Sequence, residues 1–426
     1  MLKVNKNLVV VVKSIFYKLI TLFAISFAVT LVTTKMAMAD ANFEKWKQEF
    51  RVEALEQGIQ ASLFDKSLAA LKLDPDIIRL DNSQPEFTRN IWEYLNNATS
   101  DARIKKGRSL MNQYDALFDL VEERYGVQRE IILAIWALES DYGRNYGNKN
   151  VVRSLATLAY ASGSKKRSKF ARNELLISLK ILQSYKIHSK DLVGSWAGAM
   201  GQPQFMPSSY LKYAVDQNSD GIIDLWQTIP DVVASIAHYL AESGWRKDES
   251  WGVEVKLPRK FDWRLNSSSY QLRFEQWREL NVTQVNGKDY QYPLRQAALF
   301  IPAGQFGPKF LVTHNFDVIK LYNNSSSYAL AVAQLSRLLA SGEKIQAAWP
   351  LSDKALSRYE VEEIQMRLNL EGFSPGLADG KIGIKTREAI RAWQVEQGYA
   401  GDGYANLRLL GLLRQQASSQ KPLSIK

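Results

Sequence analysis

Glu139 is the residue of this sequence whose type and setting are best suited to chemistry. It follows Ile131 to Leu138, a run of apolar residues only, which predicts a helix that is buried on every side. A carboxyl group at the C-terminal end of such a helix meets a low dielectric and the negative end of the helix dipole, and both raise its pKa. An acid still protonated near neutral pH can cleave a glycosidic bond. The segment alone leaves open a second interpretation, in which Glu139 pairs with Arg144 or caps a loop.

A second segment with chemical potential runs from Gly194 to Tyr210 and is rich in glycine and other small residues. Small residues let backbone segments approach closely, as they do at the floor of a substrate cleft. Ser195 and Gln204 could hydrogen-bond the hydroxyl or acetamido groups of a sugar. A tight structural loop in which Ser208 or Ser209 caps a helix is equally compatible with these residues.

A third segment has the ligand spacing of an EF-hand calcium loop. Oxygen-bearing side chains stand at positions 1, 3, 5 and 9, with glycine at position 6, and these side chains are Asp216, Asn218, Asp220 and Asp224. Ile222 would supply its carbonyl at position 7. Position 12 holds Gln227 in place of a bidentate Glu, and Asp231 could donate the missing carboxylate. The pattern predicts a weak or structural calcium site, and an Asx-rich turn without metal is the alternative.

The residue composition excludes several other kinds of site. The chain has no cysteine, which rules out a cysteine nucleophile, disulfides, thiolate metal sites and a lipid-modified N-terminal cysteine. The three histidines are scattered and lack the spacing of metal ligands. The sequence has neither a Gly-x-Ser-x-Gly elbow nor a phosphate-binding loop, and it has no nucleic-acid-binding motif.

Residues 1–39 have the features of a secretory signal peptide. Lysines precede the apolar stretch 19–32, and Ala37-Met38-Ala39 offers a small-x-small cleavage site. An uncleaved membrane anchor is the alternative, although the apolar stretch is short for a bilayer span. Removing the five lysines of this segment from the formal charge of +11 leaves +6, which suits a polyanionic partner such as a cell-wall polymer. We therefore expect a mature protein that is soluble outside the cytoplasm, without a membrane anchor after cleavage, and not a lipoprotein.

The rest of the chain is predicted to be mainly α-helical. Helical periodicity covers residues 43–57, 65–71, 102–125, 130–139, 172–183, 230–243 and 328–341. Alternating residues at 251–257 and 296–301 predict strands within an inserted subdomain of about 250–320. A catalytic domain of 40–345 is followed by a linker (346–356), a compact helical module (357–415) and a tail (416–426).

Three blocks in this order resemble the lytic murein transglycosylases of the membrane-bound type B family, glycoside hydrolase family 103. The blocks are residues 137–143, 196–210 and 220–226, and the resemblance extends over residues 42–340. Residues 357–413 resemble the peptidoglycan-binding domain type 1, with its signature at 379–394. The resemblance implies a lysozyme-like α-helical domain with a small inserted α/β subdomain, followed by a three-helix peptidoglycan-binding domain.

The resemblance also implies a function and a set of site residues. The family cleaves the β-1,4 bond between N-acetylmuramic acid and N-acetylglucosamine without water and leaves 1,6-anhydromuramyl ends. Glu139 falls on its single catalytic acid/base. The residues that fall on the sugar cleft are Ser195, Gln204, Tyr239, Tyr322, Asn323 and Tyr328. Those that fall on the calcium loop are Asp216, Asn218, Asp220, Ile222 and Asp231.

The expected partner is the glycan strand of peptidoglycan, bound by a monomer that needs no cofactor for its chemistry and holds calcium only as a structural ion. Two alternatives remain beside the transglycosylase. One is a lysozyme-like muramidase that uses water, and the other is a non-catalytic wall-binding scaffold. The presence of Glu139 together with its polar companions favours an enzyme over the scaffold.

Overall fold

The structure is a computed structural model that describes residues 41–82, 90–185, 187–267 and 270–419. The predicted signal peptide and the end of the predicted tail lie outside the described residues. The described chain is mainly helical, and its described residues divide into two compact units, one within 41–79 and 150–192 and the other within 80–149 and 193–419. None of the described helices has the length and hydropathy needed to cross a membrane.

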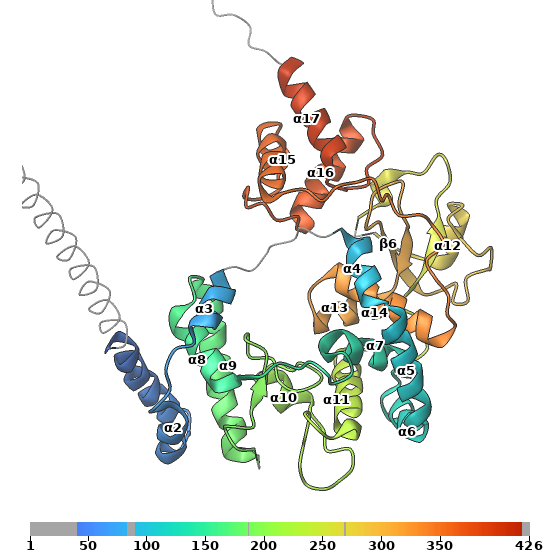
Figure 1. Cartoon of the computed structure of the whole chain (residues 1–426). Coiled ribbons are helices and arrows are strands. Elements are labelled where there is room, and N and C mark those ends of the chain that lie inside the picture. The colour runs from blue at the N-terminus through green and yellow to red at the C-terminus, as the bar shows by residue number, and fades with distance from the viewer. Residues whose placement is uncertain (1–40, 83–89, 186, 268–269, 420–426) are drawn as a thin grey trace, which may run out of the picture. The chain divides into compact units, whose positions relative to one another are not determined.

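The first unit is a group of helices. Residues 41–56 are helical, and α2 (Ala61–Leu68), α3 (Pro75–Asn82), α8 (Val151–Ala161) and α9 (Lys165–Ser184) follow along the chain. Helices α8 and α9 pack along each other (Figure 1), and their N-termini are capped by the side chains of Asn150 and Ser164. The two-residue strands β1 (Lys149–Asn150) and β2 (Val193–Gly194) lie where the chain passes between the units.

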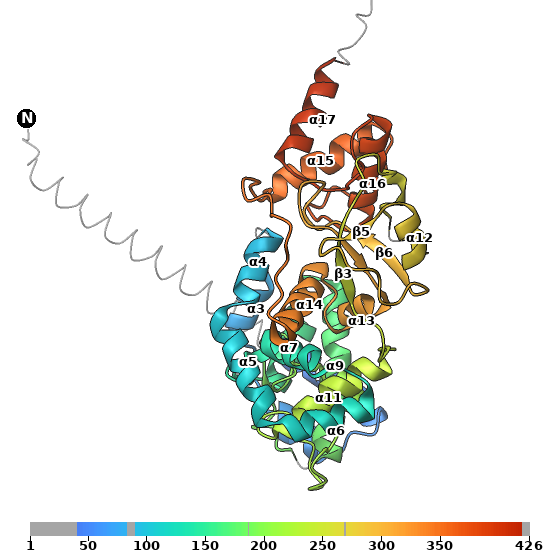
Figure 2. The ribbon, with the colours of Figure 1, turned by 90° about the vertical axis from the view of Figure 1, so that its right-hand side faces the viewer.

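The second unit is built around the buried helix α7 (Arg129–Ser140). Helices α4 (Ile91–Ala98), α5 (Asp101–Gln113), α6 (Asp115–Tyr125), α10 (Pro207–Tyr213), α11 (Ile229–Glu242), α13 (His314–Tyr322) and α14 (Ser326–Ala340) complete it. Every residue from Ile131 to Ala137 is buried, as the apolar run predicts. Helix α14 lies against α7 in both ribbon views (Figure 1, Figure 2), so residues near position 330 reach the end of α7.

The prediction of one helix over 102–125 is wrong, because the chain breaks between α5 and α6. Tyr114 has φ −114° and ψ 29°, outside the helical region, and serves as the end of one helix and the start of the next. Arg129 on α7 donates to Asp115 at 2.6 Å and so holds the first residue of α6. Neither glycine nor proline stands at the break, so the local sequence gives no sign of it. The break depends on this tertiary contact.

The inserted subdomain contains an antiparallel sheet in the order β4-β6-β7-β3-β5. Its strands are β3 (Gly252–Lys256), β4 (Gln271–Arg273), β5 (Thr283–Gln284), β6 (Gln296–Phe300) and β7 (Phe310–Val312). The predicted strands at 251–257 and 296–301 are confirmed as β3 and β6. The other three strands are too short for an alternation to be recognised. The 3-10 turn η1 (Trp263–Leu265) and helix α12 (Phe274–Glu279) complete the subdomain, which has its own core around Trp277.

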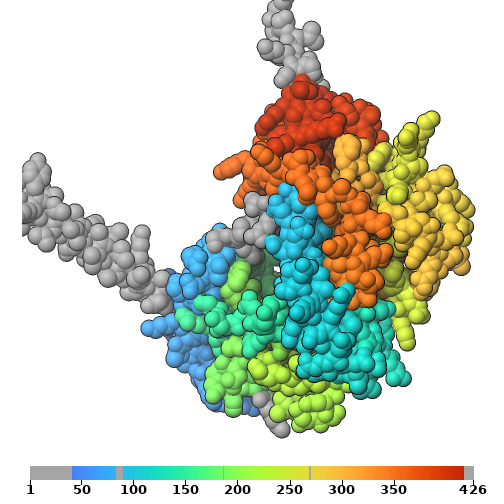
Figure 3. Space-filling model, turned by 45° about the vertical axis from the view of Figure 1, so that its right-hand side comes forward, coloured from blue at the N-terminus to red at the C-terminus, as the bar shows by residue number. Residues whose placement is uncertain are grey.

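The C-terminal module consists of α15 (Arg358–Leu370), α16 (Ile384–Glu396) and α17 (Leu407–Ser419) around a separate apolar core. Ser357 and Glu360 form a capping box at the start of α15. The preceding linker is held against β3, because Glu254 accepts hydrogen bonds from the amides of Gln346 and Ala347, both at 2.8 Å. Figure 3 shows the cyan surface of α4 and α5 beside the orange surface of α14 and the linker.

Candidate active site

Helix α7 ends at Ser140, one residue after Glu139, and the turn that follows has a strained backbone. Asp141 and Tyr142 have φ values of 53° and 59°, a left-handed conformation that is costly for residues other than glycine. The Ser140 hydroxyl accepts a hydrogen bond from the amide of Gly143 at 3.0 Å, and the Tyr142 hydroxyl donates to the Arg103 carbonyl at 3.1 Å. These bonds hold the turn and so fix where the helix presents Glu139.

Glu139 has the electrostatic character of a general acid. It is partly exposed, and its Oε1 accepts a hydrogen bond of 2.6 Å from the Tyr328 hydroxyl. Desolvation by burial raises the pKa of Glu139 to about 7, and the Tyr328 hydrogen bond opposes this rise. The raised pKa inferred from the apolar run thus agrees with the structure, with burial as its largest cause.

Two tyrosines from α13 and α14 surround this carboxyl group. Burial raises the pKa values of Tyr322 and Tyr328 well above their ordinary value, and the charge of Glu139 contributes to both shifts. The Tyr322 hydroxyl donates to the Pro203 carbonyl at 2.7 Å. The structure therefore places both predicted tyrosines near Glu139 as neutral hydroxyl groups.

Tyr239 lies next to Tyr322 and extends this aromatic wall. The two ring centroids are 4.7 Å apart, and the Tyr239 hydroxyl donates to the Leu321 carbonyl at 2.7 Å. Burial raises the pKa of Tyr239 to about 12. Asn323, which ends α13, is exposed.

Ser195 and Gln204 are held by the backbone of their own segment. The Ser195 hydroxyl accepts a hydrogen bond from the amide of Ala199 at 3.1 Å. The Gln204 Nε2 donates to the carbonyls of Tyr146 and Gly201 at 2.9 and 2.8 Å. These two side chains are thus oriented, and each keeps hydrogen-bonding capacity: the Ser195 hydroxyl hydrogen and the Gln204 carbonyl oxygen.

The interpretation of Ser208 or Ser209 as a helix cap is wrong. Helix α10 begins at Pro207, and its N-cap is Met206, which makes no capping hydrogen bond through its side chain. Proline is favoured in the first turn because its missing N–H would have no partner within the helix. Both serines lie within the helix.

Gln202 joins the three sequence blocks, and sequence reasoning did not single it out. Its Oε1 accepts from the Trp136 indole at 2.8 Å, and its Nε2 donates to the Trp226 carbonyl at 2.7 Å. Gly143 has φ 81°, and a Cβ there would meet Gln202 Oε1 at 2.2 Å. Gly143 is therefore required for two reasons: its φ is left-handed, and a side chain there would collide with Gln202.

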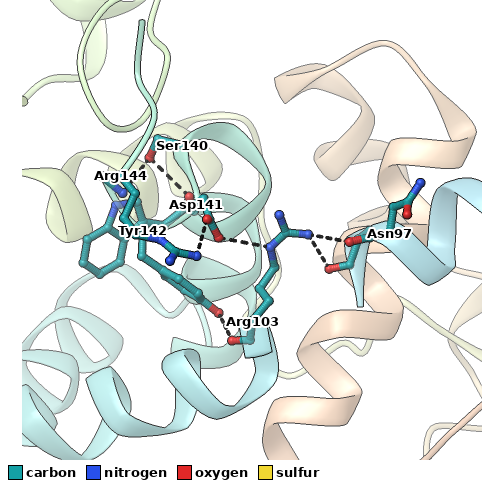
Figure 4. Close-up of polar contacts among 9 residues, drawn as sticks. Asn97, Arg103, Ser140, Asp141, Tyr142 and Arg144 are labelled. Atoms are coloured by element: carbon teal, nitrogen blue, oxygen red, sulfur yellow. Dashed lines mark hydrogen bonds and ion pairs between the residues drawn. The ribbon is translucent and has the colours of Figure 1, made fainter. Parts of the chain in front are cut away.

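Figure 4 shows a network of charged groups at the C-terminal end of α7. Arg103 Nη1 donates to the last carbonyls of α4, those of Asn97 and Ala98, at 2.9 and 2.8 Å. Its Nε donates to Asp141 Oδ1 at 3.4 Å, and Arg144 pairs with the other oxygen of Asp141. The alternative in which Arg144 pairs with Glu139 is wrong. Asp141 lies in the turn that ends α7, and Arg103 links this turn to α4.

Tyr94 on α4 is a second residue that the sequence did not reveal. Burial is the largest cause that raises the pKa of Tyr94. The charge of Glu139 raises this pKa further, and Arg103 opposes the rise. Tyr94 thus belongs to the electrostatic surroundings of the catalytic candidate. Its helix was not predicted, so its position could not be inferred.

Comparison with known proteins identifies the family. Residues 42–337 match the family described as "Transglycosylase SLT domain", and residues 357–413 match "Putative peptidoglycan binding domain". The chain belongs to the SLT transglycosylase family. The resemblance of the three sequence blocks is thereby confirmed, as is the mainly α, lysozyme-like fold with a C-terminal binding module. The activity of this SLT transglycosylase is that of a peptidoglycan lytic transglycosylase.

Named relatives agree with this assignment. The chain is 31% identical over 288 residues to membrane-bound lytic murein transglycosylase B of Escherichia coli, across 64% of this chain and 75% of the relative. The structure of SltB3 from Pseudomonas aeruginosa with NAG-anhNAM-pentapeptide has a TM-score of 0.83 and 45% identity, covering 87% and 99% of the two chains. An Escherichia coli lytic transglycosylase structure in complex with calcium has a TM-score of 0.59 and 29% identity, covering 69% and 92%.

In this SLT transglycosylase the carboxylates of the predicted calcium loop bind backbone amides. Asp216 accepts from the amides of Asp220 and Gly221 at 3.2 and 2.8 Å. The fully buried Asp231 accepts from those of Gln217 and Asp224, both at 2.9 Å. Within the described ranges, no three His, Cys, Asp or Glu side chains gather in a way that could hold a metal ion. Calcium binding by this loop, which includes Asn218 and Ile222, stays a prediction.

Proposed function

We propose that Glu139 alone supplies the acid and the base for cleavage of the bond between N-acetylmuramic acid and N-acetylglucosamine. The observation that carries this proposal is a carboxyl group with a pKa of about 7, held at the end of a buried helix by one tyrosine hydroxyl. Such a group is partly protonated and partly ionised at neutral pH, so it can serve both steps of the reaction.

In the first step, Glu139 gives its proton to the bridging oxygen, and the bond between that oxygen and C1 of the muramyl residue breaks. The 2-acetamido oxygen of the substrate relieves the positive charge that develops at C1. Tyr328 donates to Oε1, which stabilises the carboxylate that remains, and we assign the proton transfer to Oε2.

In the second step, the Glu139 carboxylate takes the proton of the muramyl C6 hydroxyl, whose oxygen attacks C1. The product is a 1,6-anhydromuramyl end, no water is consumed, and the enzyme regains its proton. One carboxyl group suffices because the nucleophile is part of the substrate and already close to C1. The complex of SltB3 with NAG-anhNAM-pentapeptide supports an anhydro product.

The polar groups of the cleft would bind the sugars through the donors and acceptors that their hydrogen bonds to the protein do not use. Both hydrogens of the Gln204 amide are used by backbone carbonyls, so Gln204 would accept a hydrogen bond from an acetamido N–H through its oxygen. Ser195 would donate its hydroxyl hydrogen. Tyr239, Tyr322 and Asn323 would contact the sugar rings and hydroxyl groups.

Mass spectrometry of muropeptides released from purified sacculi tests the reaction. We expect products one water lighter than hydrolysed muropeptides and resistant to borohydride reduction. Reducible products would identify a muramidase instead. Binding to sacculi without any release would identify a wall-binding scaffold and would refute the assignment of Glu139.

Calcium would stabilise the loop that begins at Asp216. The ion would be held by the side chains of Asp216, Asn218 and Asp220 and by the Ile222 carbonyl, which are oxygen ligands of the kind that Ca²⁺ prefers. Asp231 would have to give up an amide hydrogen bond to reach the ion, so we expect weak affinity. An Escherichia coli relative whose structure is a complex with calcium supports a site of this kind.

The test of the calcium site is the melting temperature with millimolar Ca²⁺, Mg²⁺ or chelator. Binding predicts a rise with Ca²⁺ that Asp220→Asn removes. The exposed Asp317→Asn on α13 is the matched control, and its response to calcium should equal that of the unaltered protein. A melting temperature that Ca²⁺ does not change would refute the site.

The periplasm is the compartment that fits this activity. The N-terminal signal-peptide pattern and the absence of cysteine from the sequence favour an exported protein that is not a lipoprotein. The C-terminal module would hold the enzyme on peptidoglycan strands. Fractionation of cells with an antibody against the mature chain tests this localisation, and recovery in the membrane fraction would contradict it.

A further inference from the structure

Helix α7 is buried mainly through apolar contacts, which constrain its rotation less than hydrogen bonds do. From Ile131 to Leu138 the indole N–H of Trp136 is the one polar group that any side chain carries. Hydrophobic burial is non-directional, whereas a hydrogen bond weakens steeply when its angle departs from linear. The hydrogen bond of Trp136 is therefore the side-chain contact of this run that can best fix the rotation of α7 about its axis.

Gln202 accepts that hydrogen bond and is itself held from the other side. Its Oε1 accepts from Trp136 Nε1 at 2.8 Å, and its Nε2 donates to the Trp226 carbonyl at 2.7 Å. Its backbone N–H donates to the Leu225 carbonyl at 2.8 Å. Gln202 is only 7% exposed, so solvent competes little for these bonds, and its amide is a fixed point against which α7 is held.

This fixed point lies close to the catalytic candidate. Trp136 and Glu139 are three residues apart, which puts their side chains on the same face of α7, about 4.5 Å apart along the axis at the usual rise per residue. A Cβ at Gly143, in the turn after Glu139, would meet Gln202 Oε1 at 2.2 Å. Gln202 therefore lies against α7 before Glu139 and against the turn that follows it.

The sugar-binding side chain of the same segment does not depend on this amide. Met200 and Phe205 exchange two backbone hydrogen bonds, of 2.7 and 3.1 Å, which close the turn that contains Gln202. The Nε2 of Gln204 donates to two backbone carbonyls at 2.9 and 2.8 Å. Loss of the Gln202 side chain would leave these bonds in place and would remove the hydrogen bond that holds α7.

We propose that Gln202 is a positioning residue that sets the rotation of α7 and thereby the direction in which Glu139 faces the glycosidic bond. This role rests on the proposed function of Glu139 as acid and base. Gln202 acts through Trp136 and touches no reacting atom. A small rotation of α7 would displace the carboxyl group from the bridging oxygen, and a displacement of about 1 Å can cost roughly 10²-fold in rate.

The kinetics of Gln202→Met test this role, because Met has a similar length and lacks the strong acceptor and the donor of the amide. With peptide-free glycan strands as substrate, we expect kcat for release of anhydro products to fall at least about tenfold, while KM stays within about twofold. A normal kcat would overturn the proposal. A change in KM alone would also overturn it, because it would assign Gln202 to the sugar-binding turn.

Gln183→Met is the matched control. Gln183 on α9 also makes one bond through each end of its amide, to the Gly58 carbonyl at 3.0 Å and from the Gln60 amide at 2.8 Å. These bonds lie within the first unit, whereas Glu139 and the proposed sugar-binding residues belong to the second. Both kcat and KM of this variant should equal those of the unaltered protein.

Trp136→Phe removes the same hydrogen bond from its other end and tests the role of Gln202 even if Gln202→Met fails to fold. We expect a similar loss of kcat, and the double variant should lose little more than either single variant, because both changes break one bond. Losses that multiply in the double variant would mean that the two side chains act separately and would overturn the proposal. Circular dichroism at the assay temperature checks that each variant is folded.

The indole N–H signal of Trp136 in a proton–nitrogen NMR spectrum gives a readout that does not depend on turnover. It is the signal that Trp136→Phe removes, and it should move upfield in Gln202→Met, since its proton no longer donates a hydrogen bond to the amide. An unmoved signal would overturn the proposal. If the unaltered protein released no anhydro products, the proposed reaction would be wrong, and this signal would show separately whether Gln202 holds α7.

Discussion

Glu139 and Asp231 are both acids in apolar surroundings, but the structure uses them in opposite ways. One hydroxyl group donates to Glu139, and burial raises its pKa to about 7. Two backbone amides donate to Asp231, one to each oxygen, and burial remains the largest cause that raises its pKa. Burial thus raises the pKa of both carboxyl groups, but two backbone amides fix both oxygens of Asp231, whereas one tyrosine hydroxyl binds a single oxygen of Glu139.

The largest expected effect in this comparison is on turnover. Glu139→Gln should reduce the release of anhydro-muropeptides by at least about 10³-fold, because a positioned general acid contributes roughly 10²–10⁴ and the same group serves as the base. Sacculus binding and the circular dichroism spectrum should be unchanged. Near-normal turnover by this variant would remove Glu139 from the mechanism.

Asp231→Ala should have little direct effect on chemistry and a large effect on stability. It leaves the amides of Gln217 and Asp224 without their acceptors, which we expect to lower the free energy of unfolding by about 3 kcal/mol. Urea denaturation measures this change. The exposed Asp317→Ala is the control, and an equal loss in both variants would contradict the anchoring role of Asp231.

The pH dependence of stability sharpens the contrast further. Glu139 holds its proton more tightly in the folded protein, at a pKa of about 7 against an ordinary 4.5. Its contribution is therefore fully present below pH 4.5 and is lost as the pH rises through 7. The unfolding free energy of Glu139→Gln relative to that of the unaltered protein should thus be higher at pH 8 than at pH 5, by roughly 2 kcal/mol after allowance for partial exposure.

If denaturation of Glu139→Gln and of the unaltered protein showed the same pH dependence between 5 and 8, the raised pKa would be wrong. Asp231→Asn is the matched comparison. It should lower the unfolding free energy at both pH 5 and pH 8, because the new amide nitrogen cannot accept and leaves one of the two backbone amides without an acceptor.

Tyr328→Phe should alter Glu139 without removing it. Loss of the hydroxyl removes the one hydrogen bond that lowers the pKa of Glu139, so the alkaline limb of the pH–kcat profile should move to higher pH. We expect kcat to fall about tenfold, the value of one charged hydrogen bond. An unshifted profile would mean that Tyr328 acts only by packing.

Arg103→Gln should have the smallest effect. It breaks the bridge between α4 and Asp141, two residues beyond Glu139, while Arg144 still pairs with Asp141. We expect kcat to fall about threefold with an unchanged KM, since the variant misplaces the acid without touching the substrate. A change in KM alone would assign Arg103 to binding instead of positioning.

Local sequence patterns revealed much of the fold and the centre of the site. The apolar run before Glu139 predicted a buried helix and a raised pKa, because burial of every face needs apolar residues at every position. The three motif blocks led to the family, and the signature at 379–394 led to the C-terminal module. The calcium ligands, the signal peptide and the individual sugar contacts remain predictions.

The sequence by itself determined that this protein carries an acid at the end of a buried helix and a C-terminal wall-binding module. Only the tertiary structure decided what surrounds that acid. Tyr328 reaches Glu139 across 189 residues of chain, Gln202 joins three separate blocks, and Arg103 ties α4 to the turn after α7. Such contacts depend on how distant elements pack, and neither periodicity nor spacing along one chain encodes that packing locally.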